Sequence, residues 1–118
     1  MSFFLDQFDP FVVVGNWLDA CRWRKLDSLI NLYDEQATFE CDCEGVRLTG
    51  RKWIAAYWKP KLESKAVLAF SLIDVALIVD GVRLNYQSDE GKPVRMNFRF
   101  SPSGKILHTS CGPLLRNA

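Results

Sequence analysis

The sequence of 118 residues lacks the charge excess and the long apolar runs that mark nucleic-acid-binding and membrane proteins. Fifteen lysines and arginines face fourteen aspartates and glutamates, for a formal net charge of +1. Nucleic-acid-binding domains usually carry a clear basic excess, so this balance argues against nucleic acid as a partner. No apolar run approaches the ~20 residues that a membrane-spanning helix needs. We therefore expect neither a nucleic acid nor a membrane as partner.

The N-terminus also lacks the positive charge that begins a secretory signal. Residues 1–11 contain Asp6 and Asp9 and no basic side chain. Four cysteines without an export signal predict reduced thiols in a cytoplasmic protein. The sequence also has no internal repeat and no linker-like tract, and the chain length is typical of a domain with one hydrophobic core. We expect a single domain over residues 1–118.

Signatures of metal or cofactor chemistry are equally scarce. Cys41, Cys43, Cys111 and the single histidine, His108, are the possible metal ligands. Residues three apart on a strand point to opposite faces, so His108 and Cys111 would not converge on one ion. Nucleotide-binding loops and nucleophile elbows are not found either. The sequence predicts no metal site and no cofactor.

The first half of the chain contains three amphipathic stretches and a short hairpin. Asp9-Pro10 is a good helix start, and apolar residues follow it at helical period. Asp27 is the expected cap of a short second helix, and Thr49 of a third that kinks or ends at Pro60. Between these two helices, residues 37–43 and 46–48 predict two strands joined at Glu44-Gly45.

The second half predicts a four-strand antiparallel meander over residues 66–79, 82–87, 94–100 and 105–111. Asp80-Gly81 is a strong hairpin signal between the first two strands. The middle strands alternate cleanly between an apolar face and a face of arginines and amides. Helices first and strands afterwards predict an α+β domain in which the helices cover one face of the sheet.

This order of elements, with several short motifs, resembles the nuclear transport factor two-like superfamily, which includes SnoaL-like and ketosteroid isomerase-like proteins. The motifs are residues 26–39 at the second helix and first strand, residues 49–51 opening a helix, and residues 97–105. The resemblance covers residues 10–112. It implies a cone-shaped α+β barrel: a curved, mixed, mostly antiparallel sheet wrapped around three helices of the N-terminal half, commonly as a dimer, with a cavity inside.

The resemblance also identifies where a ketosteroid isomerase would carry its catalytic groups. The general-base carboxylate falls at Cys41, the oxyanion-binding tyrosine near Trp17, and the buried carboxylic acid near Met96. An isomerase of this kind needs a carboxylate to move a proton and donors aimed at the oxyanion. Met96 cannot donate a hydrogen bond and Cys41 is not a carboxylate, so ketosteroid isomerase activity is not expected.

The register that the family implies predicts a mostly aromatic and sulfur-rich pocket lining. Its residues are Trp17, Phe39, Cys41, Cys43, Trp53, Tyr57, Met96, Phe98, Phe100, Leu107, Thr109 and Cys111. Such a lining suits a flat or apolar ligand that is oriented by a few polar groups such as Tyr57 and Thr109. The alternative is that these side chains simply fill a closed core.

Three residues are the acid-base candidates if the pocket is catalytic: Asp74, Tyr57 and His108. Asp74 lies in an apolar run, where a buried carboxylate needs a partner or a raised pKa. The alternative for Asp74 is a sheet edge or a dimer interface, where it would pair with an arginine. For His108, strand alternation predicts the outer face, together with Ile106 and Ser110, unless a bulge changes the register.

The face of the sheet opposite the helices is predicted to form a homodimer interface. It would carry Arg83, Arg95, Asn97 and Arg99 near the carboxylates of Glu40 and Asp42. The expected function is binding of a small, largely apolar or aromatic molecule in the cone. The alternatives are a cofactor-independent isomerase, cyclase or dehydratase, and a non-catalytic dimeric interaction module.

Overall fold

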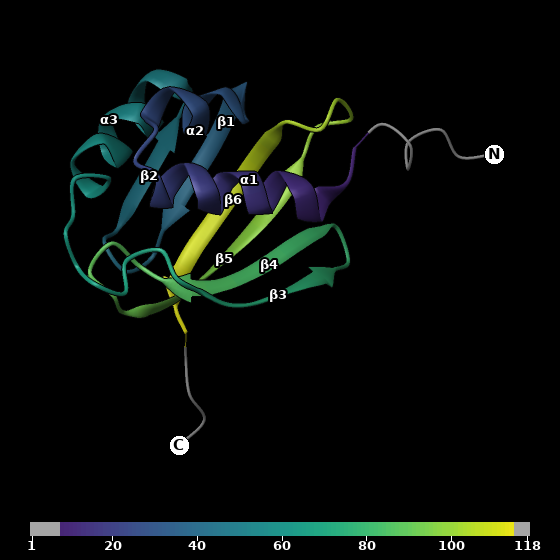
Figure 1. Cartoon of the computed structure of the whole chain (residues 1–118). Coiled ribbons are helices and arrows are strands. Elements are labelled where there is room, and N and C mark those ends of the chain that lie inside the picture. Colours follow the sequence, from purple (N-terminus) through teal and green to yellow (C-terminus); the bar gives the residue numbers. More distant parts are fainter. Residues whose placement is uncertain (1–7, 115–118) are drawn as a thin grey trace.

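Three helices lie on the concave side of a single curved sheet (Figure 1). The structure, a computed structural model, describes residues 8–114. Within this range the helices are α1 (Pro10–Arg22), α2 (Leu26–Asn31) and α3 (Arg51–Lys61). The strands are β1 (Tyr33–Cys41), β2 (Val46–Thr49), β3 (Leu72–Ile78), β4 (Gly81–Gln87), β5 (Pro93–Phe100) and β6 (Ile106–Pro113).

The strands form one sheet in the order β2-β1-β6-β5-β4-β3. Strands β3 to β6 follow one another as an antiparallel meander, and β2 pairs antiparallel with β1. The pairing of β1 with β6 is parallel and joins the two halves of the chain. The prediction of a mixed, mostly antiparallel sheet that curves around three helices is therefore confirmed.

The helix starts agree with the sequence at α1 and differ at the other two helices. The Asp9 carboxylate accepts a hydrogen bond from the Phe11 N–H at 2.9 Å and caps α1, as predicted. The predicted caps of α2 and α3 are wrong. Lys25 precedes α2, which leaves Asp27 inside the first turn. Gly50, at φ 93°, precedes α3 because Thr49 still belongs to β2.

The predicted strand over residues 66–79 is too long. Strand β3 begins only at Leu72, and the preceding residues turn. Phe70 has φ 61°, its N–H donates to the Gln87 carbonyl at 2.8 Å, and its ring is buried. An apolar run is equally consistent with a strand and with a loop that inserts one ring into the core, which is why hydrophobicity alone missed the turn.

A bulge in β6 reverses two predicted orientations. Phe100 is opposite Ile106 and Arg99 is opposite His108, so Leu107 has no partner in this ladder. As a result Ile106 is fully buried and Leu107 is 39% exposed, whereas the sequence predicted Ile106 outward and Leu107 inward. Thr109 is buried, as predicted, because the bulge lies before it.

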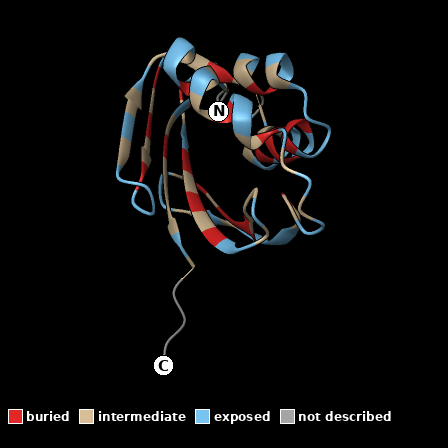
Figure 2. Cartoon of the chain, turned by 90° about the vertical axis from the view of Figure 1, so that its left-hand side faces the viewer, coloured by how far each residue is buried: buried red, intermediate tan, exposed pale blue. Residues whose placement is uncertain are grey.

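The core lies between the helices and the concave face of the sheet. Figure 2 shows the buried residues on the surfaces that α1 and the sheet turn toward each other. Its largest fully buried side chains include Trp17, Tyr33, Phe39 and Phe98. Among the residues that the structure describes, no helix has both the length and the apolar character needed to span a bilayer.

Candidate functional site

A cavity of about 310 Å³ opens at one end of the core, where the first and last strands lie beside α3. The turns that connect β1 to β2 and β4 to β5 complete its walls. The lining residues are Phe39, Cys41, Cys43, Glu44, Tyr57, Trp58, Lys61, Tyr86, Ser88, Asp89, Glu90, Lys92, Val94, Met96 and Cys111. This volume is at the lower end of the range for small-molecule sites.

The floor of the cavity is apolar and aromatic. Phe39 comes from β1, Trp58 from α3, and Met96 from β5, and all three side chains are buried. The Phe39 and Trp58 rings meet edge to face with centroids 6.0 Å apart. Strand alternation turns Tyr86 and Val94 toward the same space. A flat apolar group would find contact on several sides here.

The mouth of the cavity is polar and internally hydrogen-bonded. The Tyr57 hydroxyl donates to one carboxylate oxygen of Glu44 at 2.6 Å, and the Lys61 ammonium donates to the other at 2.9 Å. Lys61 also lies 3.7 Å from the Asp89 carboxylate and 4.8 Å from the centroid of the Tyr57 ring. Three elements therefore meet at one cation: the β1–β2 turn, α3 and the β4–β5 turn.

These contacts shift the protonation equilibria of the mouth. The hydrogen bonds from Tyr57 and Lys61 lower the pKa of Glu44. Burial, and then the hydrogen bond to Glu44, raise the pKa of Tyr57 far above its usual value. Burial opposes the charge of Lys61, but the hydrogen bond with Glu44 and the carboxylate charges outweigh it, so its pKa rises. Burial raises the pKa of Asp89, although Lys61 acts in the opposite direction.

Three thiols form one wall of the cavity. Cys41 on β1 is opposite Cys111 on β6 in the parallel ladder, and Cys43 follows in the adjoining turn. Burial, and then the neighbouring thiols, raise the pKa of Cys111, so this thiol is protonated at neutral pH. No group of three or more potential metal-ligating side chains meets the geometry of a metal site within residues 8–114.

The structure brings five of the nine residues predicted to bind ligand into this cavity: Phe39, Cys41, Tyr57, Met96 and Cys111. Trp53 does not line it. Its side chain is 58% exposed on the far side of α3, beside Lys52, whereas Trp58 faces inward. Of the three other residues in the predicted lining, Cys43 lines the cavity, while Phe100 and Leu107 do not.

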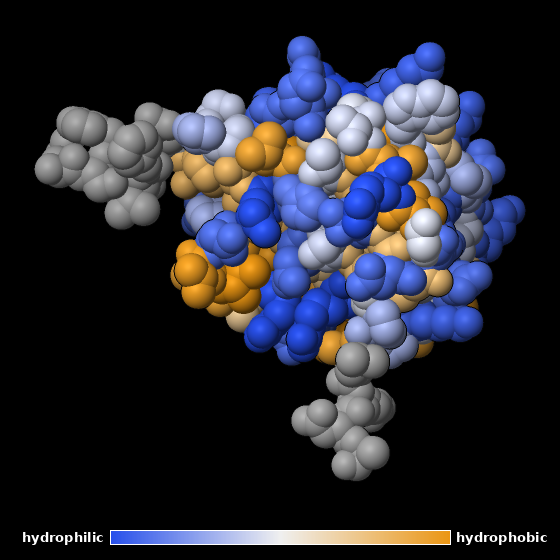
Figure 3. Space-filling model, turned by 180° about the vertical axis from the view of Figure 1, so that it is seen from behind, coloured by the Kyte–Doolittle hydropathy of each residue, from blue (hydrophilic) through white to orange (hydrophobic). Residues whose placement is uncertain are grey.

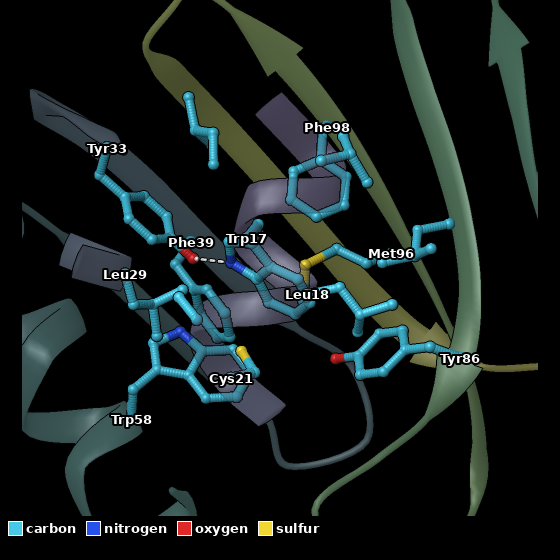
Figure 4. Close-up of a cluster of buried hydrophobic side chains, with 14 of the residues drawn as sticks. Trp17, Leu18, Cys21, Leu29, Tyr33, Phe39, Trp58, Tyr86, Met96 and Phe98 are labelled. Carbon is cyan, nitrogen blue, oxygen red and sulfur yellow. Dashed lines mark hydrogen bonds between the residues drawn. The ribbon is translucent and has the colours of Figure 1, made fainter. Parts of the chain in front are cut away.

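The remaining three predicted ligand-binding residues, Trp17, Phe98 and Thr109, are buried behind the cavity floor. The Trp17 indole N–H donates to the Tyr33 hydroxyl at 3.0 Å, as Figure 4 shows. The Trp17 ring also meets Phe98 edge to face at 5.3 Å. These side chains fill the centre of the cone, which confines the cavity to its mouth.

The two other acid-base candidates lie outside the cavity. Asp74 is exposed on the edge strand β3 and accepts a hydrogen bond from the Asn85 amide at 2.8 Å. The partner predicted for a surface Asp74 was an arginine, but Asn85 separates it from Arg95. His108 is half-buried and its Nδ1 is hydrogen-bonded to the Thr38 hydroxyl, away from the lining residues.

Several lining residues were not in the predicted set: Glu44, Trp58, Lys61, Tyr86 and Asp89. The spacing of Tyr57 and Lys61 is i, i+4, which places both on one helix face and is a signal that the sequence offered. Glu44 and Asp89 lie in or beside turns. No periodicity indicates where a turn side chain points, so the sequence held no comparable signal for them.

Comparison with known proteins gives structural likeness only. No protein-family model and no curated protein matches the sequence. A SnoaL-like protein of unknown function from Burkholderia thailandensis is 20% identical, with a TM-score of 0.74, over 86% of this chain and 92% of that chain. A protein of unknown function from Burkholderia xenovorans, described as NTF-2 like, is 16% identical, with a TM-score of 0.75, over 99% and 91% of the two chains.

A third solved structure of similar fold contains a small molecule. It is a protein from Catenulispora acidiphila with a ketosteroid isomerase-like fold, in complex with trimethylamine. It is 18% identical to this chain, with a TM-score of 0.64, over 84% of this chain and 82% of that chain. The element order, the sheet topology and these likenesses agree, so this chain has the nuclear transport factor two-like fold.

Proposed function

We propose that the protein binds a small, largely apolar or aromatic molecule in the cavity bounded by Phe39, Trp58 and Met96. The observation that carries this proposal is the separation of an apolar floor from a polar mouth within one cavity. An apolar ligand body packs against the aromatic and thioether groups. Its polar end reaches the charged network of Glu44, Tyr57 and Lys61.

Proton-transfer chemistry has less support than binding. Of the acid-base candidates from the sequence, only Tyr57 lines the cavity, and its raised pKa and donated hydrogen bond keep its phenol protonated, so it is not available to accept a proton. Asp89, whose pKa burial raises, is the lining carboxyl group best suited to give up and regain a proton. For an isomerase, cyclase or dehydratase activity, Asp89 is therefore the acid-base group that we assign.

The two methionines of the chain offer a direct test of binding. With [methyl-13C]methionine, the protein gives one signal from Met1 and one from Met96, which lines the cavity. Titration with 2-naphthol, a flat probe with one hydroxyl, should shift the Met96 signal in a saturable manner. An unchanged Met96 signal at millimolar probe would contradict the proposal.

Paired substitutions at two valines test where the probe binds. Val94→Phe places a ring into the cavity and should raise the dissociation constant of 2-naphthol about tenfold or more. Val75→Phe is the matched control, because Val75 lies on β3 outside the cavity and is already partly exposed. Equal affinities in both variants would show that the probe binds elsewhere.

We also propose that two copies of the chain dimerise through the outer face of the sheet. Arg83, Arg95 and Asn97 are half-buried there, and Arg99 is exposed and pairs with Asp80 at 3.2 Å. Arg83 Nε and Asn97 Oδ1 are buried atoms with no hydrogen-bond partner among the described residues. Figure 3, which views this face, shows hydrophilic side chains between hydrophobic ones. A second copy would supply partners for these polar atoms.

A further inference from the structure

One polar group on the floor of the cavity, the Tyr86 hydroxyl, differs from the hydroxyls of the other two tyrosines of the chain. The Tyr33 hydroxyl accepts the Trp17 N–H, and the Tyr57 hydroxyl donates to Glu44. The Tyr86 hydroxyl makes no hydrogen bond to any residue that the structure describes. Buried polar groups are normally paired, so this hydroxyl marks a place where a bound molecule can supply the missing partner.

Tyr86 faces the cavity from β4 and is almost fully enclosed by protein. It is only 2% exposed, and it lines the cavity together with Val94, its partner on β5. Its ring meets the Trp17 ring edge to face at 5.4 Å, which limits where the hydroxyl can point. Figure 4 shows the hydroxyl directed from β4 into the cone. Trp58 Nε1 and Thr109 Oγ1 are sealed inside the core without a partner, but the Tyr86 oxygen is not, so it borders open space of the cavity.

The hydroxyl lies on an uncharged part of the lining. The charged residues among the described lining lie on α3 or in the β1–β2 and β4–β5 turns, and they are Glu44, Lys61, Asp89, Glu90 and Lys92. Beside Tyr86, the strands offer Val94, Met96 and the Cys111 thiol. Burial raises the pKa of Tyr86 well above its usual value, so the phenol stays protonated and can donate. An anionic ligand group here would lose its hydration without gaining a counter-ion, which favours a neutral acceptor.

We propose that the Tyr86 hydroxyl donates a hydrogen bond to a carbonyl oxygen of the bound molecule, which makes the ligand a small aromatic ketone or aldehyde. This inference rests on the proposed function, because it assigns one group of the molecule that the cavity binds. A phenol has one proton to donate and a carbonyl oxygen only accepts, so a single bond satisfies both groups. A ligand hydroxyl in the same place would leave one of the two hydroxyl protons without an acceptor.

Two other arrangements fit the Tyr86 hydroxyl less well. A buried water needs about three polar partners, whereas the neighbouring floor offers aliphatic carbon, a thioether and a thiol. A ligand carbonyl directed at the Lys61 ammonium would place an apolar group against the Tyr86 hydroxyl and leave this buried donor unpaired. Lys61 already has Glu44 and Asp89 as partners, so it does not depend on the ligand. A carbonyl at Tyr86 leaves both groups satisfied.

A matched pair of probes tests the hydrogen bond. Acetophenone and α-methylstyrene have the same shape, but the ketone has an oxygen where the alkene has a methylene group. Binding is followed by the [methyl-13C]methionine signal of Met96, which lines the cavity. Acetophenone should bind about tenfold more weakly to Tyr86→Phe than to the wild type, because one buried hydrogen bond is lost. α-Methylstyrene should bind to Tyr86→Phe at least as tightly as to the wild type.

Tyr33→Phe is the matched control. It also removes a buried tyrosine hydroxyl, but Tyr33 does not line the cavity. Both probes should therefore bind to Tyr33→Phe as they bind to the wild type. The carbonyl stretching band of bound acetophenone gives a second measurement, because a donated hydrogen bond lowers its frequency. The band should lie at lower frequency in the wild type and in Tyr33→Phe than in Tyr86→Phe.

The outcomes separate this inference from the proposed function. If Tyr86→Phe changes neither the affinity for acetophenone nor its carbonyl band, the carbonyl lies elsewhere in the cavity and the role of Tyr86 is wrong, although binding stands. If Tyr33→Phe weakens acetophenone binding as much as Tyr86→Phe does, the effect is not specific to Tyr86 and the inference also fails. If neither probe shifts the Met96 signal, the proposed function is wrong, and this inference with it.

Discussion

Glu44 is the residue on which the mouth of the cavity depends most. It accepts hydrogen bonds from a phenol and an ammonium group that come from the same face of α3, at 2.6 and 2.9 Å. Both donors stabilise its charged form. Each carboxylate oxygen can accept a further hydrogen bond, and the Lys61 ammonium has more donors than the one that Glu44 uses. The mouth can therefore meet either a donor or an acceptor of a ligand.

Replacing Tyr57 tests this dependence. In Tyr57→Phe, we expect the pKa of Glu44 to rise toward the usual value of about 4.3, because the first of its two donors is lost. Carboxyl 13C chemical shifts followed against pH measure it. Tyr86→Phe is the control, since it removes another cavity hydroxyl without a hydrogen bond to Glu44. Identical Glu44 titrations in both variants would contradict the assigned role.

The same pKa shift fixes the direction of a stability change with pH. Because the pKa of Glu44 is lowered in the folded state, its contribution is present above the unfolded pKa and is lost as the pH falls through the folded value. Glu44 is well exposed to solvent, so screening keeps this contribution below about 1 kcal/mol. Tyr57→Phe should accordingly lower the free energy of unfolding slightly at pH 7 and less at low pH.

Single residues also show why the site was only partly predictable. Phe39, Cys41 and Met96 were placed correctly because alternation along a regular strand fixes which way each side chain points. On α3 the sequence offered two tryptophans, and the burial of Trp58 rather than Trp53 depends on how the helix is rotated against the sheet. Helix propensity and apolar periodicity do not determine this rotation closely enough to tell which of the two tryptophans faces the sheet.

Among the strands, β6 is where alternation alone fails. The bulge at Leu107 places one extra residue between the inward side chains of Ile106 and Thr109. The amino-acid types at these positions do not indicate a bulge. Strands β4 and β5 have no such irregularity in their mutual pairing, and their inward faces agree with the predicted ones. The order of the elements and the antiparallel pairing within the meander were therefore predictable, whereas the parallel pairing of β1 with β6 and a local change of register were not.

Two alanine substitutions in β6 test the bulge directly. Ile106→Ala removes a fully buried side chain and should lower the free energy of unfolding by about 2–4 kcal/mol. Leu107→Ala removes a partly exposed side chain and should cost less than about 1 kcal/mol. Urea denaturation of both variants and the wild type measures the difference. Regular alternation would reverse this order, so a larger loss at Leu107 would refute the bulged register.

For the molecule as a whole, the size of the cavity follows from how much of the cone its own side chains occupy. The rings of Trp17, Tyr33 and Phe98 take the central volume, and Trp17 and Tyr33 satisfy each other by a hydrogen bond (Figure 4). The sequence predicted either an open cone or a filled one. The structure is intermediate, because the centre is packed and only the mouth is open.

The outer face of the sheet leads to the last prediction, on assembly. Asn97 is in the middle of β5, and its side-chain oxygen lies buried without a partner among the described residues. Asn97→Lys would place one new positive charge per subunit on this face, close to its arginines. If two copies pair here, like charges face each other across the two-fold axis, and the dimer dissociation constant should rise about tenfold or more.

Sedimentation velocity over a range of protein concentrations measures this constant. Val12→Lys is the matched control, because it adds the same charge at an exposed position of α1, on the helix side of the molecule. We expect wild type and Val12→Lys to sediment as dimers and Asn97→Lys to dissociate. If the wild type sediments as a monomer at every concentration, no second copy supplies partners for the buried polar atoms on this face, and the proposed dimer is wrong. If Asn97→Lys leaves the dimer dissociation constant unchanged, the two copies pair through another surface.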